Sequence, residues 1–444
     1  MEKNRLFKGK NAEETKDIFM EFLTKKEQWF GKLLYSIKEG WIKNGCNVTE
    51  ILLRERQPVA IAILKAYIPC EIKDGTQEFL PTGHQIQGVV ERFTNRNVGT
   101  SGDALIGESI DFAFQVFGLG IFRINSSYSS DGAQLSIRYL PFDVPRLEDV
   151  GYPTVYQSYL KGMTEAASVK SPPIDGSEFY GQVGEGDNPA MTVKPVITTI
   201  KTNVPRSGGG LILHIGPTGS GKTTAMAAEV NYLASTTAGL ILTYEDPIEY
   251  SFYGTPSPVA SFELGRDIKQ NDDFTMTEMV RRHSLRKNPA VIMFGEMRTA
   301  EQMRMVVGMA NSGHWVLASM HGQAVDEAIG VLASIFKDEP YVLANSLKAA
   351  VAHRLATNSK GEVIPLFEIF IPDQVRVDAL AKGDLNEIKR VFKEDLGSQS
   401  VSFKKSLQHL LDTQRITLSE VEQIERMTFG NLIKVGKENK NVAI

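Results

Sequence analysis

The sequence predicts an α/β protein, with a parallel sheet covered by helices in its second half and a smaller α+β domain before it. The first observation is an alternation of short apolar runs and helix-length stretches from residue 211 onward, which is typical of parallel sheets. The second is a series of short β-rich runs between residues 59 and 140, separated by glycine-containing turns. A length of 444 residues allows two or three domains.

The elements of the first half follow from the spacing of apolar residues and turns. Residues 12–44 carry apolar side chains at helical intervals and predict one or two amphipathic helices. Gly118, Gly120 and the Ser-Ser-Asp-Gly stretch at 129–132 predict turns that join the later runs into an antiparallel meander. The expected strands are Val59–Leu64, Ile110–Phe117, Ile121–Ser126 and Gln134–Leu140.

The second half begins after a stretch rich in Pro, Gly and Ser at residues 168–210, which predicts a linker with a mobile loop. Helices are expected at 275–286, 300–312 and 325–336, and the chain after Ile371 is expected to be helical. The expected strands are Leu211–Ile215, Leu240–Tyr244, Val291–Phe294 and Trp315–Ser319.

The composition excludes several classes of protein. A formal net charge of −4 gives no global attraction to nucleic acid. Two cysteines, Cys46 and Cys70, indicate no disulfide framework and suit a reducing cytoplasm. No apolar run approaches the roughly 18 residues of a membrane span, and the charged N-terminus lacks an apolar signal core. We therefore expect a cytoplasmic protein.

A complete phosphate-binding loop follows the apolar run 211–215. The pattern G-x-x-x-x-G-K-[ST] is matched, and the small residues within it leave backbone N–H groups free to wrap a phosphate chain. Lys222 would reach the β- and γ-phosphates, and the Thr223 hydroxyl would bind Mg²⁺. We expect ATP or GTP to be bound by Gly216, Pro217, Thr218, Gly219, Ser220, Gly221, Lys222, Thr223 and Thr224.

Acidic residues follow two of the later strands, where an open α/β sheet places its ligands. Residues 243–249 hold three carboxylates, which indicate either a site for Mg²⁺ or water or a solvated acidic loop. The apolar run 291–294 leads to Glu296, which is the Walker B arrangement that aims an acid at Mg²⁺ or at the attacking water. The alternative is a buried strand that ends in a surface glutamate.

Three further residues are candidates for catalysis. His321 follows the apolar run 315–319 by two residues and is either a γ-phosphate sensor or a structural histidine. Arg123 and Arg138 lie on expected strands of the first half, and arginines often neutralise the γ-phosphoryl group across a subunit interface. The alternative for both is an exposed arginine on a strand.

Together these segments resemble the secretion ATPase superfamily and, within it, the PilT-like retraction ATPases of type IV pili. The four sequence boxes of that superfamily occur in order at 216–224, 243–249, 291–296 and 317–321. Residues 110–114, 120–125 and 147–151 are similar to its N-terminal domain, and residues 351–355, 361–363 and 403–421 to the end of its core and its C-terminal helices.

The resemblance implies a RecA-like P-loop NTPase core, a PAS-like N-terminal domain and C-terminal helices. The implied parts are an N-terminal helical extension at 1–45, the PAS-like domain at 46–155, a linker and insertion at 156–207, the ATPase core at 208–370 and the C-terminal helical region at 371–444. It also implies a homohexamer, peripherally docked at the inner membrane, that uses ATP and Mg²⁺. Its partners would be a platform protein of a pilus or secretion system and a paralogous ATPase, with no direct contact to nucleic acid.

The resemblance also implies roles for individual residues. Glu249 would polarise the attacking water, Glu296 would support Mg²⁺ together with Thr223, and Arg123 with Arg138 would act across the interface between subunits. Which of the two glutamates is the base stays open.

The chain departs from the retraction ATPases at several positions. It has Arg298-Thr299 where they have Arg-Asp, Ala290 where they have Asp, and Ser319-Met320-His321-Gly322 where they have Thr-Leu-His-Thr. These departures fit a divergent branch that serves conjugation or type IV secretion. Two alternatives remain, a weakly hydrolysing accessory ring subunit and a nucleic-acid motor.

Overall fold

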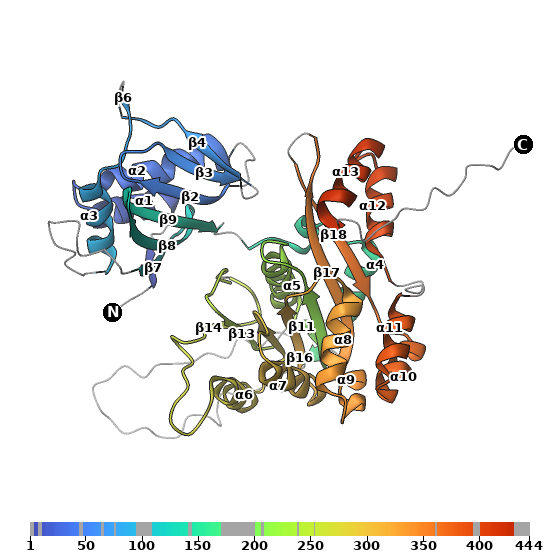
Figure 1. The fold of residues 1–444 in the computed structure, drawn as a ribbon. Helices are drawn as coiled ribbons and strands as arrows, with labels where there is room; N and C mark the ends of the chain where they lie inside the picture. Colours follow the sequence, from blue (N-terminus) through green and yellow to red (C-terminus); the bar gives the residue numbers. More distant parts are fainter. Residues whose placement is uncertain are drawn as a thin grey trace, which may run out of the picture. The chain divides into compact units, whose positions relative to one another are not determined.

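The computed structural model describes residues 4–7, 11–43, 48–63, 66–74, 77–94, 109–140, 144–169, 200–205, 208–237, 239–252, 254–359, 362–393 and 400–429. The chain divides into two units (Figure 1). The first contains Met1–Val144 and Glu249–Ser251, and the second contains Pro145–Ile248 and Phe252–Ile444.

The first unit is built on a seven-stranded sheet with the order β1-β7-β8-β9-β2-β3-β4. Only β1 and β7 pair in parallel, so the expected antiparallel meander is confirmed for β7, β8 and β9. The strands are β1 Asn4–Phe7, β2 Val48–Arg54, β3 Val59–Ile63, β4 Ala66–Cys70, β7 Ile110–Val116, β8 Gly120–Ser129 and β9 Gly132–Leu140, and a separate pair is formed by β5 Lys73–Asp74 and β6 Gln77–Glu78.

Helices α1 (Ala12–Phe22), α2 (Gln28–Ile37) and α3 (Gly83–Thr94) share one hydrophobic core with this sheet. The helices expected within residues 12–44 are confirmed, and a short π-helix at Lys38–Ile42 extends α2. Aromatic rings fill the core, and the ring of Phe114 on β7 stacks on Phe93 with 4.4 Å between centroids. Because β7 alternates buried and less buried side chains, one of its faces is committed to this core.

The second unit contains a seven-stranded sheet with the order β14-β13-β15-β16-β12-β17-β18. All neighbours are parallel except β17 and β18, which form an antiparallel edge. The strands are β12 Gly210–Ile215, β13 Ile241–Glu245, β14 Val259–Glu263, β15 Val291–Phe294, β16 Trp315–Met320, β17 Leu347–Thr357 and β18 Val363–Phe370. The α/β class and the RecA-like core are confirmed, with β16 lying between β12 and β15.

Both faces of the second sheet are covered, which explains why its strands are apolar throughout. Leu211 and Leu213 of β12 belong to one core, which contains most of the helices of this unit. Ile212 belongs to the core on the other face, which contains α5 (Lys222–Thr236) and α4 (Thr154–Gly162). The helices in the core of Leu211 and Leu213 are α6 Met276–Lys287, α7 Ala300–Asn311, α8 Val325–Ile335, α9 Pro340–Ser346, α10 Gln374–Lys382, α11 Leu385–Lys393, α12 Phe403–Asp412 and α13 Leu418–Phe429.

The helices expected from the 3.6-residue spacing are confirmed at α6, α7 and α8, and the helical character after Ile371 is confirmed for the described residues. Residues 170–199, most of the expected linker, lie outside the described residues. The ends of that stretch pair as β10 (Thr164–Val169) and β11 (Ile200–Pro205). None of the helices in the described part of the chain has the length and apolarity that a membrane span requires.

Candidate nucleotide-binding site

The phosphate loop connects the end of β12 to the start of α5 and depends on glycine at three positions. Gly219 and Gly221 have φ angles of 76° and 90°, which L-residues with a side chain rarely adopt. A Cβ atom at Gly216 would collide with the hydroxyl of Ser220 and lie 3.0 Å from the carbonyl oxygen of His353. The loop is therefore as tight as the sequence pattern requires.

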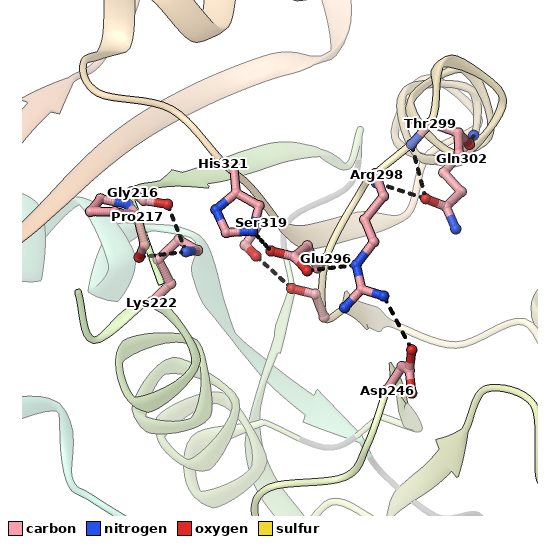
Figure 2. A network of polar contacts seen from close by, with 11 residues as sticks. Gly216, Pro217, Lys222, Asp246, Glu296, Arg298, Thr299, Gln302, Ser319 and His321 are labelled. Carbon is pink, nitrogen blue, oxygen red and sulfur yellow. Dashed lines mark hydrogen bonds and ion pairs between the residues drawn. The ribbon is translucent and has the colours of Figure 1, made fainter. Parts of the chain in front are cut away.

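The side chain of Lys222 folds back over this loop (Figure 2). Its ammonium donates to the carbonyl oxygens of Gly216 at 2.7 Å and Pro217 at 3.1 Å, and the residue is only 8% exposed. The buried hydroxyl of Ser220 has no hydrogen-bond partner among the described residues. A nearly buried cation and an unpaired hydroxyl at the N-terminus of α5 favour binding of an anion such as a phosphate.

A second group of polar side chains lies at the ends of β15 and β16 (Figure 2). Glu296 contacts His321 through Oε1, 2.7 Å from Nε2, and accepts from Nε of Arg298 through Oε2 at 2.8 Å. The hydrogen bond to Glu296 raises the pKa of Arg298 above its ordinary value. The guanidinium also contacts Asp246, with 3.3 Å between Nη1 and Oδ2. The structure thus brings together Glu296 and His321, as the sequence predicts for neighbouring strand ends.

The three carboxylates of residues 243–249 have separate surroundings. Glu245 is buried and accepts from the Thr243 hydroxyl at 2.8 Å, whereas Asp246 is exposed. Glu249 clusters with the first unit, where its Oε1 lies 3.4 Å from Nη1 of Arg123. The stretch is thus neither one bunched metal site nor a freely solvated loop.

Arg123 and Arg138 are directly opposite each other on β8 and β9 and so point to the same face of the first sheet. Arg138 is exposed and Arg123 is partly buried. Their roles across a subunit interface, and the role of Glu249 as the base, stay predictions.

The residues expected to hold Mg²⁺ are Thr223 and Glu296. The described residues contain no group of three or more His, Cys, Asp or Glu side chains that could hold a metal ion. Mg²⁺ usually takes one or two protein oxygens and completes its shell with water and substrate phosphates. A hydroxyl at the start of α5 and a carboxylate at the end of β15 fit an ion that arrives with a nucleotide.

Sequence reasoning missed a buried polar cluster behind the loop, formed by Tyr152, Tyr156, His214, Glu229 and His353. Two signals in the sequence point to it. One histidine interrupts the apolar run of β12, and one glutamate interrupts the apolar face of α5. Single polar residues at such positions are either paired in the core or functional.

Comparison with known proteins identifies the family. The model of the family "Type II/IV secretion system protein" matches residues 195–427, a little over half of the 444 residues. The type IV pilus ATPase PilU of Pseudomonas aeruginosa is 25% identical over 316 residues, covering 70% of this chain and 69% of that protein. The type IV pilus retraction ATPase PilT of the same organism is 28% identical over 266 residues, covering 59% and 62% of the two chains.

Two solved structures share the fold. The pilus retraction motor PilT with bound ADP has a TM-score of 0.62 at 23% identity, covering 87% of this chain and 95% of that one. The Legionella pneumophila ATPase DotB has a TM-score of 0.68 at 18% identity, covering 95% and 99%. The resemblance inferred from the four sequence boxes is confirmed, and the chain belongs to the Type II/IV secretion system protein family.

Proposed function

We propose that this chain is the subunit of a homohexameric motor that hydrolyses ATP and converts the energy into domain motion for a type IV pilus or a type IV secretion machine. The observation that carries the proposal is the nearly buried Lys222 in a tight phosphate loop, with His321 and Glu296 at the ends of the next two strands. Relatives named as ATPases of type IV pili support it.

In the proposed reaction, the loop and Lys222 bind the phosphates, and Thr223 with Glu296 would hold Mg²⁺. The ion would supply positive charge that offsets the charge of the phosphates. Glu249 polarises the attacking water, and Arg123 and Arg138 of a neighbouring subunit stabilise the charge that develops on the γ-phosphoryl group. The imidazole of His321 orients the Glu296 carboxylate, since the two are 2.7 Å apart.

The proposed machine is a divergent one. Thr299 is the N-cap of α7, and its hydroxyl accepts a hydrogen bond from the N–H of Gln302. The retraction ATPases carry an Asp at this position. A neutral cap cannot provide the charge of a carboxylate, which favours a machine other than a standard retraction motor. We assign an inner-membrane platform protein as the docking partner and place the ring on the cytoplasmic side.

The test is steady-state phosphate release combined with a separate measurement of nucleotide affinity. Glu249→Gln and Glu296→Gln should each lower the rate at least tenfold while ATP still binds, because the first removes the group that polarises the water and the second removes a Mg²⁺ ligand, whereas the loop and Lys222 still bind the phosphates. Glu301→Gln, on an exposed acid of α7, is the matched control. Parental rates in both glutamine variants would refute the site, and binding without turnover in the parental protein would favour the accessory-subunit alternative.

One observation favours the nucleic-acid alternative. A cavity of about 510 Å³ beside α6 is lined by cationic side chains and an aromatic ring, among them Arg282, Arg286, Lys287 and Phe274. Basic and aromatic groups together are typical of single-strand binding. The pair of Arg282 with Glu278 at 2.8 Å already neutralises part of this charge, and the chain is acidic overall. ATPase activity stimulated by DNA, with strongly salt-dependent binding, would make this function the preferred one.

A further inference from the structure

A cluster of five polar side chains is buried in the core that α4 and α5 share with the second sheet. Its members are Tyr152, Tyr156, His214, Glu229 and His353, and each is at most 3% exposed. We refer to it as the Glu229 cluster. It lies apart from the Glu296 group and has no part in the reaction proposed above.

Glu229 is the centre of the cluster. Its Oε1 accepts from the hydroxyls of Tyr152 at 2.6 Å and Tyr156 at 3.1 Å. Its Oε2 lies 3.2 Å from Nε2 of His214, and Nδ1 of His214 lies 2.9 Å from Nε2 of His353. The chain of contacts therefore runs without a break from the start of the second unit, through α5 and β12, to β17.

The positions of the protons follow from the surroundings. Burial, and then the charge of Glu229, raises the pKa of both tyrosine hydroxyls well above the ordinary value, so both donate. Burial, with His214 and Lys222 acting in the same direction, lowers the pKa of His353 well below its ordinary value, so its imidazole is neutral. Nε2 of this neutral imidazole is within hydrogen-bond distance of Nδ1 of His214.

The cluster adjoins the phosphate loop through the strand that precedes the loop and the helix that follows it. His214 stands two residues before Gly216, and Glu229 stands two helical turns after Lys222 on the same face of α5. The carbonyl oxygen of His353 packs against Gly216, and Arg354 donates to that carbonyl at 3.3 Å. The cluster therefore connects the strand before the loop to the helix after it.

A packing role alone does not explain the carboxylate. Burying a carboxyl group is unfavourable, and an apolar side chain of similar size at such a position is often as stable or more so. The neighbours of Glu229 on α5 are apolar, among them Ala228 and Val230. A buried carboxyl group at this position, which lies on the helix that follows the loop and accepts from the tyrosines at the start of the second unit, indicates a functional role.

We propose that Glu229 is a positioning residue for the phosphate loop, and that its bonds to Tyr152 and Tyr156 make nucleotide affinity depend on where the segment 152–156 lies. The proposal rests on the nucleotide site proposed above. That segment is among the first of the second unit after the chain leaves the first unit. A displacement of the segment breaks two hydrogen bonds to a charged acceptor and releases α5 from its fixed position.

The experiment compares the double variant Tyr152→Phe/Tyr156→Phe with two controls on α4. Tyr159→Phe removes a hydroxyl that donates to the backbone carbonyl of Lys348 at 2.9 Å, outside the cluster. Leu160→Ala makes a cavity in the same core and lowers stability without touching Glu229. ADP affinity by calorimetry, KM and kcat for ATP, and the melting temperature are measured for each protein.

The double variant should bind ADP at least fivefold more weakly and raise KM for ATP by a similar factor at a temperature well below its melting point. Both controls should stay within twofold of the parental affinity even where they melt earlier. Glu229→Gln should weaken ADP binding at least as much, and the single tyrosine variants replace the double one if it does not fold.

Unchanged ADP affinity in the cluster variants, with a lower melting temperature alone, would overturn the proposal and leave the cluster a core network. Weaker binding in Leu160→Ala that matches its loss of stability would overturn it too, since affinity would then follow stability. Parental protein that binds no ADP would instead refute the nucleotide site, so the two failures are distinguishable.

Discussion

Replacing Lys222 by methionine is the sharpest test of the nucleotide site. The change keeps the length of the side chain and removes the ammonium, which in the described state donates to two backbone carbonyls. Without nucleotide the protein should lose little stability, because the loss of two hydrogen bonds, about 1 kcal/mol each, is offset by no longer burying a cation.

The effect on nucleotide binding should be much larger. In the complex the ammonium exchanges neutral carbonyl oxygens for charged phosphate oxygens, and hydrogen bonds to charged groups contribute about 1.5–3 kcal/mol each. Two such bonds correspond to at least about 3 kcal/mol, which is about a 100- to 200-fold higher Kd for ATP.

The assay is a titration with fluorescent ATP, accompanied by thermal melts with and without nucleotide. Nucleotide at 100 times the parental Kd should stabilise the parental protein by about 2.7 kcal/mol and the variant hardly at all. Lys348→Met on β17 is the control, because it removes a lysine from the strand next to β12 without changing the loop. An ATP affinity of Lys222→Met within threefold of the parental value would refute the reasoning.

Three further predictions concern the loop, the metal and the C-terminal helices. Gly216→Ala should abolish tight ADP binding and destabilise the protein by about 1–3 kcal/mol, since its Cβ would collide with Ser220; unchanged calorimetric affinity would contradict the loop geometry. Chelation of Mg²⁺ should stop phosphate release while ADP still binds, and phosphate release that persists in excess chelator would contradict the metal assignment. Hydrogen bonds from Ser359 and Thr417 lower the pKa of Glu420 from 4.5 to about 2, so its contribution to stability is present above pH 4.5 and lost as pH falls toward 2. Urea unfolding of Glu420→Gln should therefore show a deficit at neutral pH that shrinks in acid, and a deficit independent of pH would contradict the shift.

Much of the fold could be predicted because its signals are local. The apolar runs of β12, β15 and β16 and the helical spacing of α7 and α8 are complete within short windows, so the strands and helices were expected within a residue or two. The hairpin of β17 and β18 was not predicted, because Leu347–Thr357 mixes apolar residues with Lys348, His353 and Arg354 and does not by itself distinguish a strand from a helix.

The parts of the site that lie on one continuous stretch of chain were predictable, and the parts that join distant residues were not. The phosphate loop is continuous, and Glu296 and His321 meet because parallel strands end at one edge. The Glu229 cluster joins residues up to 201 positions apart, from Tyr152 to His353, and a local sequence pattern cannot predict contacts over such a separation. The contact of Arg123 with Glu249 was missed for the same reason.

The position of Arg298 has a consequence for how a divalent ion would enter the edge of the sheet. Its single guanidinium bridges Glu296 and Asp246, and more than half of its side chain is exposed. Exposed ion pairs of this kind contribute at most about 1 kcal/mol, so a dication can displace the arginine from Glu296 at small cost. The contact of Arg298 with Asp246 uses a different nitrogen of the guanidinium, so Asp246 can keep the arginine as its partner after Glu296 turns to the ion.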